Sequence, residues 1–205
     1  AANALLKTLE EPKPGVVIML LAASLDQLPP TIVSRGQILL FRPAGREQVY
    51  DYLVNEHKAS REQAKILARL SAGRPALAAK LFGNPEFFSA RKKIVSFGLK
   101  LLTAGMSERL KLAAELMADT GAAVNARTQA AGILEIWQTV IRDLLLLNLQ
   151  IEEFVANEMA LDELKQINLP LNKLLSARQA LERGVKYLGA NVNPKLVLEN
   201  VSLQI

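Results

Sequence analysis

Cysteine is absent from this chain of 205 residues, and histidine occurs once, as His57. These absences exclude disulfides, Cys/His zinc sites, iron–sulfur clusters and cysteine nucleophiles within these residues. His57 stands near the end of a predicted helix, where we expect a structural role. The longest apolar runs, residues 16–23 and 144–147, are far shorter than the roughly 18 residues that a membrane span needs. We therefore expect a soluble, cytoplasmic protein with no membrane contact and no metal site.

The motifs that hold nucleotides or nucleophiles are also missing. The sequence contains no Gly-x-x-x-x-Gly-Lys-Ser/Thr loop, no Gly-x-Gly-x-x-Gly, no nucleophile elbow and no His-Glu-x-x-His. Adjacent acids such as Glu10 and Glu11 point about 100° apart on a helix, so they do not form an acid/base pair. We therefore expect that this chain binds no cofactor and hydrolyses no ATP by itself.

The composition is that of a folded protein with a small excess of positive charge. Hydrophobic residues make up 50% and charged residues 22%, which is enough to bury a core. With 25 Lys and Arg against 20 Asp and Glu the formal charge is +5, which suits an acidic partner such as nucleic acid. The basic residues, including the run 91–93, are scattered on predicted helices, where most such residues face solvent. The interpretation of this chain as a stand-alone nucleic-acid-binding module is therefore supported by the net charge alone.

The first 43 residues have the pattern of the end of an α/β domain. Residues 3–11 have helix-forming composition, and prolines end that helix. Residues 16–23 form a continuous apolar run rich in β-branched side chains, which is typical of a strand buried on both faces. A short helix is predicted over residues 29–35 and a second strand over residues 37–41.

The rest of the sequence predicts helices almost throughout. Helices over 46–57, 61–70 and 75–82 form a predicted three-helix bundle at residues 44–84, with a capping box at Ser60 and Gln63. Residues 85–205 predict an all-α domain with helices near 86–104, 107–119, 125–149, 158–167, 171–189 and 194–203, and Trp137 is expected in its core. The predicted fold class is α+β and mainly α: an α/β remnant, a three-helix bundle and an all-α domain.

Arg35 is the best candidate for a functional side chain. It ends the short helix between the two predicted strands, and a guanidinium there can present a planar fork of donors to a phosphate on another subunit. The alternative is an ordinary surface arginine. Sequence spacing alone leaves both interpretations open.

Two stretches of the sequence resemble a known family. Residues 1–12, AANALLKTLEEP, and residues 28–35, LPPTIVSR, resemble the clamp-loader branch of the AAA+ ATPases. A Ser-Ala-Gly-x-Pro pattern at 71–75 and NVNPKLVLE at 191–199 are similar to the delta-prime family of bacterial DNA polymerase III. The resemblance implies that 1–43 end an AAA+ core, that 44–84 form the helical lid and that 85–205 form the collar that holds the subunits together. It also implies that a P-loop, an acidic metal-binding strand and a zinc module precede Ala1.

The resemblance gives roles to three residues. Ser34 and Arg35 match the family's Ser-Arg-Cys motif, with Gly36 in place of the cysteine, which implies a catalytic pair whose arginine acts in trans as a finger. In that arrangement ATP and Mg²⁺ are bound by the neighbouring subunit, and none by this chain. Lys7 matches a lysine that faces the DNA channel in related motor subunits, so the resemblance makes it a candidate for DNA contact.

Two sensor sites depart from the pattern of active motor subunits. Ala22 and Ala23 stand where active relatives carry a polar nucleotide sensor. Ala76 stands three residues after Gly73, where the second sensor is an arginine, and Arg74 is out of register on another helical face.

Both departures favour a non-motor subunit of the DNA polymerase III clamp loader, which scaffolds the complex and supplies Arg35. Its implied partners are the tau/gamma motor subunits and the delta subunit, with the sliding clamp and primed DNA reached through the assembly. The alternative is an active motor ATPase of the tau/gamma type whose P-loop lies before Ala1.

Overall fold

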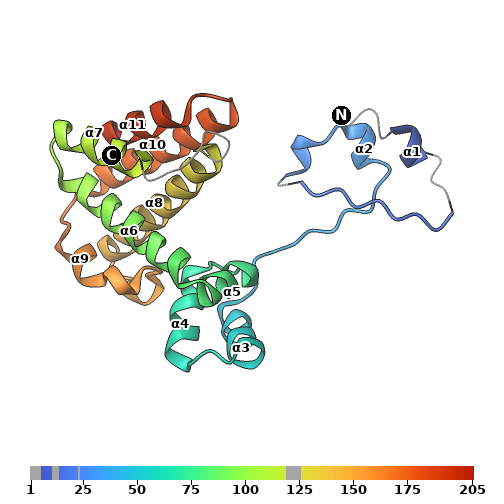
Figure 1. The fold of residues 1–205 in the computed structure, drawn as a ribbon, viewed down its shortest axis with the longest axis horizontal. Coiled ribbons are helices and arrows are strands. Elements are labelled where there is room, and N and C mark those ends of the chain that lie inside the picture. The colour runs from blue at the N-terminus through green and yellow to red at the C-terminus, as the bar shows by residue number, and fades with distance from the viewer. Residues whose placement is uncertain (1–5, 11–13, 23, 119–125) are drawn as a thin grey trace. The chain divides into compact units, whose positions relative to one another are not determined.

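Helices supply the regular structure of this protein, as Figure 1 shows for the computed structural model. The structure describes residues 6–10, 14–22, 24–118 and 126–205. The chain separates into two compact units, Ala1–Arg42 and Pro43–Ile205. Each unit is described by itself below.

The first unit contains three short helical elements. They are α1 (Leu6–Glu10), the 3-10 turn η2 (Leu25–Gln27) and α2 (Pro30–Val33). Proline is the first residue of α2. It is favoured at this position because its fixed φ fits a helix and the first helical N–H needs no partner within the helix. Ile32 of α2 is buried, and α1 packs against α2.

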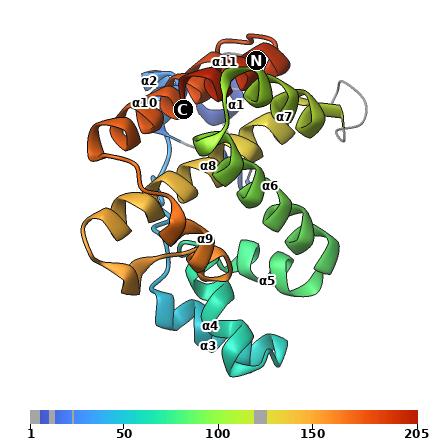
Figure 2. The same ribbon diagram turned by 90° about the vertical axis from the view of Figure 1, so that its left-hand side faces the viewer.

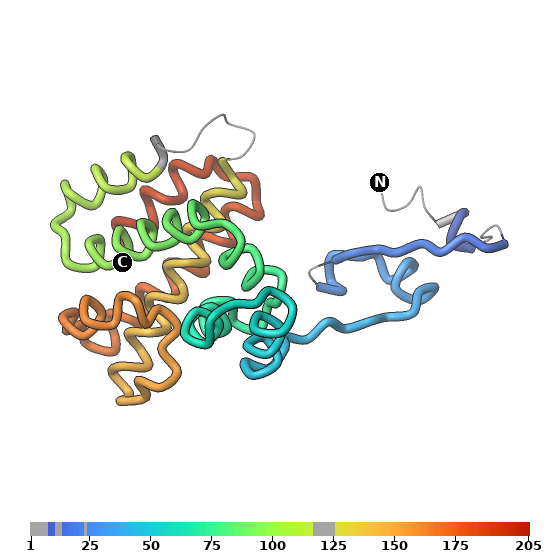
Figure 3. Tube along the Cα trace, turned by 60° about the horizontal axis from the view of Figure 1, so that its bottom comes forward, coloured from blue at the N-terminus to red at the C-terminus, as the bar shows by residue number. Residues whose placement is uncertain are grey.

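The two predicted strands are not formed in the described residues. Residues 16–22 and 37–41 run as extended chain without strand pairing, and Figure 3 shows both stretches; residue 23 lies outside the described residues. Most of their side chains are exposed, with Leu21 94% and Phe41 91% exposed, and Ile18 is half-buried. The prediction was wrong because apolar, β-branched composition favours a strand only where a neighbouring strand accepts its backbone hydrogen bonds. No described segment supplies that neighbour.

The second unit begins with a small bundle, defined as α3 (Arg46–His57), α4 (Arg61–Leu70) and α5 (Pro75–Gly83). The three helices enclose a core of their own, which includes Val49, Leu53, Leu70 and Leu81. The Ser60 hydroxyl accepts the Gln63 N–H at 3.2 Å and caps α4. In the predicted capping box the Gln63 side chain returns to the Ser60 backbone, whereas here it bonds the Ser60 hydroxyl.

The remaining helices form a large bundle. They are α6 (Pro85–Thr103), α7 (Met106–Ala118), α8 (Ala126–Asn148), α9 (Leu161–Gln166), α10 (Leu171–Gly189) and α11 (Pro194–Gln204), with the 3-10 turns η3 (Glu152–Phe154) and η4 (Glu158–Ala160). Helix α8 crosses the middle of this bundle and packs on α6, α10 and α11 (Figure 2). Trp137 of α8 is 1% exposed, and its Nε1 donates to the Ile94 carbonyl at 3.0 Å. The prediction that Trp137 belongs to the core is confirmed.

A buried carboxylate fixes the segment after α8. Asp143 is fully buried, and its two oxygens accept the backbone N–H groups of Ala156 and Asn157 at 3.0 and 2.8 Å. The Asn157 amide adds a third bond at 2.7 Å. Burying a carboxylate costs free energy, and hydrogen bonds from N–H donors offset that cost. The carboxylate therefore holds the segment that leads to Glu158.

Two ion pairs join the small bundle to the large one. Arg69 of α4 pairs with Glu158, and Arg74, which immediately precedes α5, pairs with Glu135 of α8. Met159 packs against both hydrophobic cores. The segment held by Asp143 is thus a direct link between the two bundles.

Candidate functional site

Arg35 lies just beyond the end of α2 and is held by two contacts within the first unit. Its Nη1 donates to the Thr31 carbonyl at 2.8 Å, one helical turn back. Its Nη2 pairs with the Glu10 carboxylate of α1 at 2.7 Å. The Ser34 hydroxyl also donates to the Thr31 carbonyl, at 3.2 Å. Ser34 therefore stabilises the end of the turn, while the guanidinium extends from it.

The Arg35 guanidinium is open to an incoming anion. The side chains of Arg35 and Glu10 are 37% and 51% exposed, and exposed ion pairs contribute only about 0–1 kcal/mol. A phosphate offers more charge and accepts two parallel N–H bonds from a guanidinium. A phosphate on another molecule can therefore displace Glu10.

The sensor positions named above lie apart from Arg35 in the sequence and carry no phosphate-binding side chain. Ala22 is exposed, and Ala23 lies outside the described residues. Ala76 is exposed on α5. The Arg74 side chain donates through Nε to the Ser71 carbonyl at 3.0 Å and pairs with Glu135, both within the second unit.

The DNA-contact candidate Lys7 belongs to α1, but its side chain lies outside the described residues. His57 is half-buried, and its ring stands edge-on to Tyr52 and Phe82 with centroids 5.0 and 6.1 Å away. These contacts fit the expected structural role of His57. The described residues contain no cluster of three or more His, Asp or Glu that could hold a metal. Among the helices described, none has the length and apolar character to cross a membrane.

The interpretation of residues 91–93 as a solvent-facing run is wrong for its first member. Arg91 is only 7% exposed, and its Nη2 reaches the Thr139 hydroxyl at 3.4 Å. A signal was present in the sequence, because position 91 shares helical spacing with Val95, Gly98 and Leu102, all of which are buried. Arg91 therefore cannot serve as a freely exposed phosphate contact.

Comparison with known proteins places relatives of this chain in bacterial replication. A family described as "DNA polymerase III, delta subunit" matches residues 1–45. The DNA polymerase III subunits delta' of Bacillus subtilis and Haemophilus influenzae are each 37% identical to this chain over 95 residues. The matched region covers 46% of this chain and 28% and 29% of the two relatives. The match thus spans less than a third of those relatives' length. Together these matches support a relationship of this chain with the delta' subunits of DNA polymerase III.

Proposed function

We propose that this chain acts as part of a non-motor, delta'-type subunit of the bacterial DNA polymerase III clamp loader. In this role residues 85–205 are the collar that scaffolds the assembly, and residues 44–84 are the lid. Arg35 completes an ATP site on a neighbouring tau/gamma subunit, and the complex, which includes the delta subunit, loads a sliding clamp onto primed DNA. The observation that carries the proposal is the exposed Arg35 guanidinium at the end of α2, inside the region that matches the family.

The chemistry of an arginine finger supports the proposal. A fixed guanidinium aimed at the charge that develops on a transferring phosphoryl group is worth about 10³ to 10⁵ in rate. Such a group acts on a nucleotide that another subunit binds. This suits a chain whose sequence has no P-loop motif and has Ala22 and Ala76 at the sensor positions. The delta' identity of the relatives also favours this role over the tau/gamma motor. Within the same proposal, Lys7 is the residue that faces DNA.

The test is DNA-stimulated ATPase activity of a clamp loader reconstituted with the full-length protein. Arg35→Ala should lower turnover at least tenfold while the assembly elutes at the same size, and Arg35→Lys should restore little because a lysine lacks the planar fork. Arg42→Ala is the matched control, since Arg42 is another exposed arginine of the same unit. Glu10→Gln should keep turnover at or above the wild-type value because it removes the competing carboxylate. Unchanged turnover in Arg35→Ala would leave this subunit with a scaffolding role alone.

A further inference from the structure

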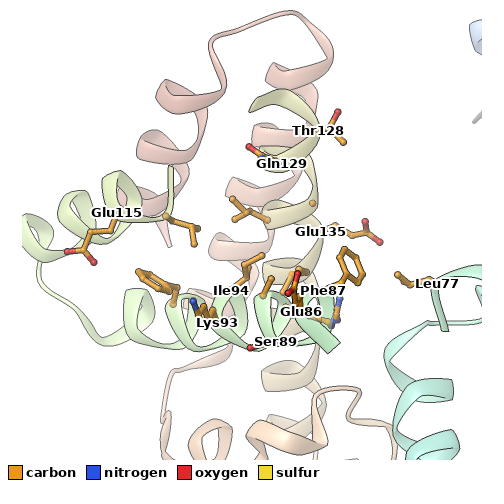
Figure 4. A pocket seen from close by; sticks show the side chains of 17 residues that line it. Leu77, Glu86, Phe87, Ser89, Lys93, Ile94, Glu115, Thr128, Gln129 and Glu135 are labelled. Atoms are coloured by element: carbon orange, nitrogen blue, oxygen red, sulfur yellow. The ribbon is translucent and has the colours of Figure 1, made fainter. Parts of the chain in front are cut away.

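A groove of about 730 Å³ lies between α6 and α8 in the large bundle. Figure 4 shows α6 and α8 on two sides of it, α7 with Glu115 at one end and Leu77 of α5 at the other. Its size is that of a ligand site. The lining is mostly apolar and includes Phe87, Ile94, Phe97, Leu116, Ile133 and Ile136.

One buried cation lines this groove. Arg91 is 7% exposed, and its Nε has no hydrogen-bond partner among the described residues. Its Nη2 donates to the Thr139 hydroxyl at 3.4 Å. Burial lowers the pKa of Arg91, because desolvation disfavours the charged guanidinium. Buried charges are normally paired with a charge of opposite sign. Among the residues described, Arg91 has no such partner, and a carboxylate of another molecule can supply it.

The charges of two carboxylates, Glu135 and Asp143, act on Arg91, and each carboxylate is bonded to other groups. Glu135 pairs with Arg74, and Asp143 accepts three N–H bonds from the segment after α8. The acidic groups at the rim, Glu86 and Glu115, are exposed, where water screens them. No ion pair to Arg91 is made within the described part of the chain.

Gly132 of α8 lies in the lining of the groove. A Cβ added to Gly132 would meet no atom within 4 Å. A glycine inside a helix costs about 1 kcal/mol relative to alanine, and no packing contact within the described chain requires it. Ala90 of α6 also lines the groove. Small side chains on two crossing helices allow a third helix to approach closely.

Two polar groups that line the groove lack partners among the residues that the structure describes, and they are of opposite kinds, a donor on Arg91 and an acceptor on Gln129. The Gln129 side-chain oxygen is buried and lacks a donor among the described residues. An occupant that satisfies both groups therefore brings a carboxylate to Arg91 and an N–H donor to Gln129.

We propose that this groove binds an amphipathic helix of a partner protein, whose apolar face covers Gly132 and whose Asp or Glu pairs with Arg91. The groove lies in the residues proposed as the collar, so the inference rests on that role and names a surface for it, but it does not depend on the function proposed for Arg35. It accounts for the apolar lining, the unpaired guanidinium and the uncovered glycine with one occupant.

The probe is a displayed library of helical peptides of about 16 residues, roughly 24 Å long, with a fixed apolar stripe and all amino acids allowed elsewhere. Selection on the full chain should enrich peptides with an Asp or Glu at one fixed place beside the stripe. The affinity of a synthetic enriched peptide should fall at least tenfold for Arg91→Met and for Gly132→Leu, which fills the groove. Lys92→Met is the matched control and should leave the affinity unchanged, since Lys92 is exposed on α6 and lies over Phe88 outside the groove.

A second arm of the experiment changes the peptide instead of the protein. Replacing its carboxylate by the amide should weaken binding to the wild type at least tenfold and leave binding to Arg91→Met unchanged, as coupled partners require. The comparison of acid and amide peptides on the wild type holds even if Arg91→Met fails to fold. Equal binding of the acid and amide peptides, full binding to Gly132→Leu, or no enrichment at all would each overturn the proposal. Octanoate that binds as tightly as the peptide would make a small carboxylate the occupant and overturn it too.

Discussion

Alanine at Gly98 should destabilise the large bundle, whereas alanine at Gly132 should stabilise it. Both glycines lie inside long helices. A Cβ at Gly98 would stand 2.7 Å from Trp137 Cδ1 and 2.9 Å from its Nε1, much closer than van der Waals contact allows. The indole cannot retreat without cost, because it is 1% exposed and bonded to the Ile94 carbonyl at 3.0 Å.

The two substitutions share one contribution to the unfolding free energy and differ in a second. Each replaces a helical glycine by alanine and gains about 1 kcal/mol of helix propensity. Gly98→Ala also overpacks a buried ring, which costs about 1–3 kcal/mol, so its net effect is a loss of about 0–2 kcal/mol. Gly132→Ala meets open space and keeps the whole gain. The difference in unfolding free energy between the two variants is therefore about 1–3 kcal/mol, and it isolates the steric cost.

Urea unfolding followed by tryptophan fluorescence measures this difference. Trp137 is the only tryptophan in the sequence, so the signal reports on the bundle that contains both glycines. Gly132→Ala should raise the midpoint, and Gly98→Ala should lower it and shift the emission of the folded state. Two variants of equal stability would refute the reasoning, because they would show that the indole yields at no cost.

Further substitutions test other contacts of the second unit. Asp143→Asn should cost about 2–4 kcal/mol of unfolding free energy, since an amide nitrogen would face donors, among them the Asn157 N–H; hydrogen exchange should then accelerate in the segment after α8. Gly73→Ala should destabilise the small bundle by more than about 1 kcal/mol, because φ is +78° and the new Cβ would stand 2.6 Å from the Ala44 carbonyl oxygen; a thermal melt that does not move would contradict this. Ser60→Ala should remove the cap of α4 at a cost of about 1 kcal/mol, and a loss of helical circular dichroism on mild heating would reveal it.

The helices were predictable because their signals are local. Pro75, Pro85 and Pro194 occupy the first positions of α5, α6 and α11, where proline fits a helix. Asn84 accepts the Phe87 N–H at 2.9 Å and caps α6. Such contacts lie within one turn of the chain, so the sequence displays both partners together.

The strands and the buried polar groups depend on partners that are distant in the sequence. Residues 16–22 have the composition of a strand but no pairing neighbour among the described residues. Arg91 is buried against α8, and Asp143 bonds a segment that begins beyond the helix end. No local pattern fixes such contacts. For Arg35 the sequence left a phosphate-binding role and an ordinary surface role open, and the Glu10 pair is visible only in the packing of α1 on α2.

The two ion pairs between the bundles differ in how strongly dissolved salt acts on them. Arg74 and Glu135 have side chains 44% and 50% exposed, whereas those of Arg69 and Glu158 are 13% and 29% exposed. Dissolved ions screen the first pair far more than the second. At high ionic strength the Arg74–Glu135 pair therefore weakens first. The Arg69–Glu158 pair and the packing of Met159, Phe87 and Phe88 against the small-bundle core then hold the two bundles together.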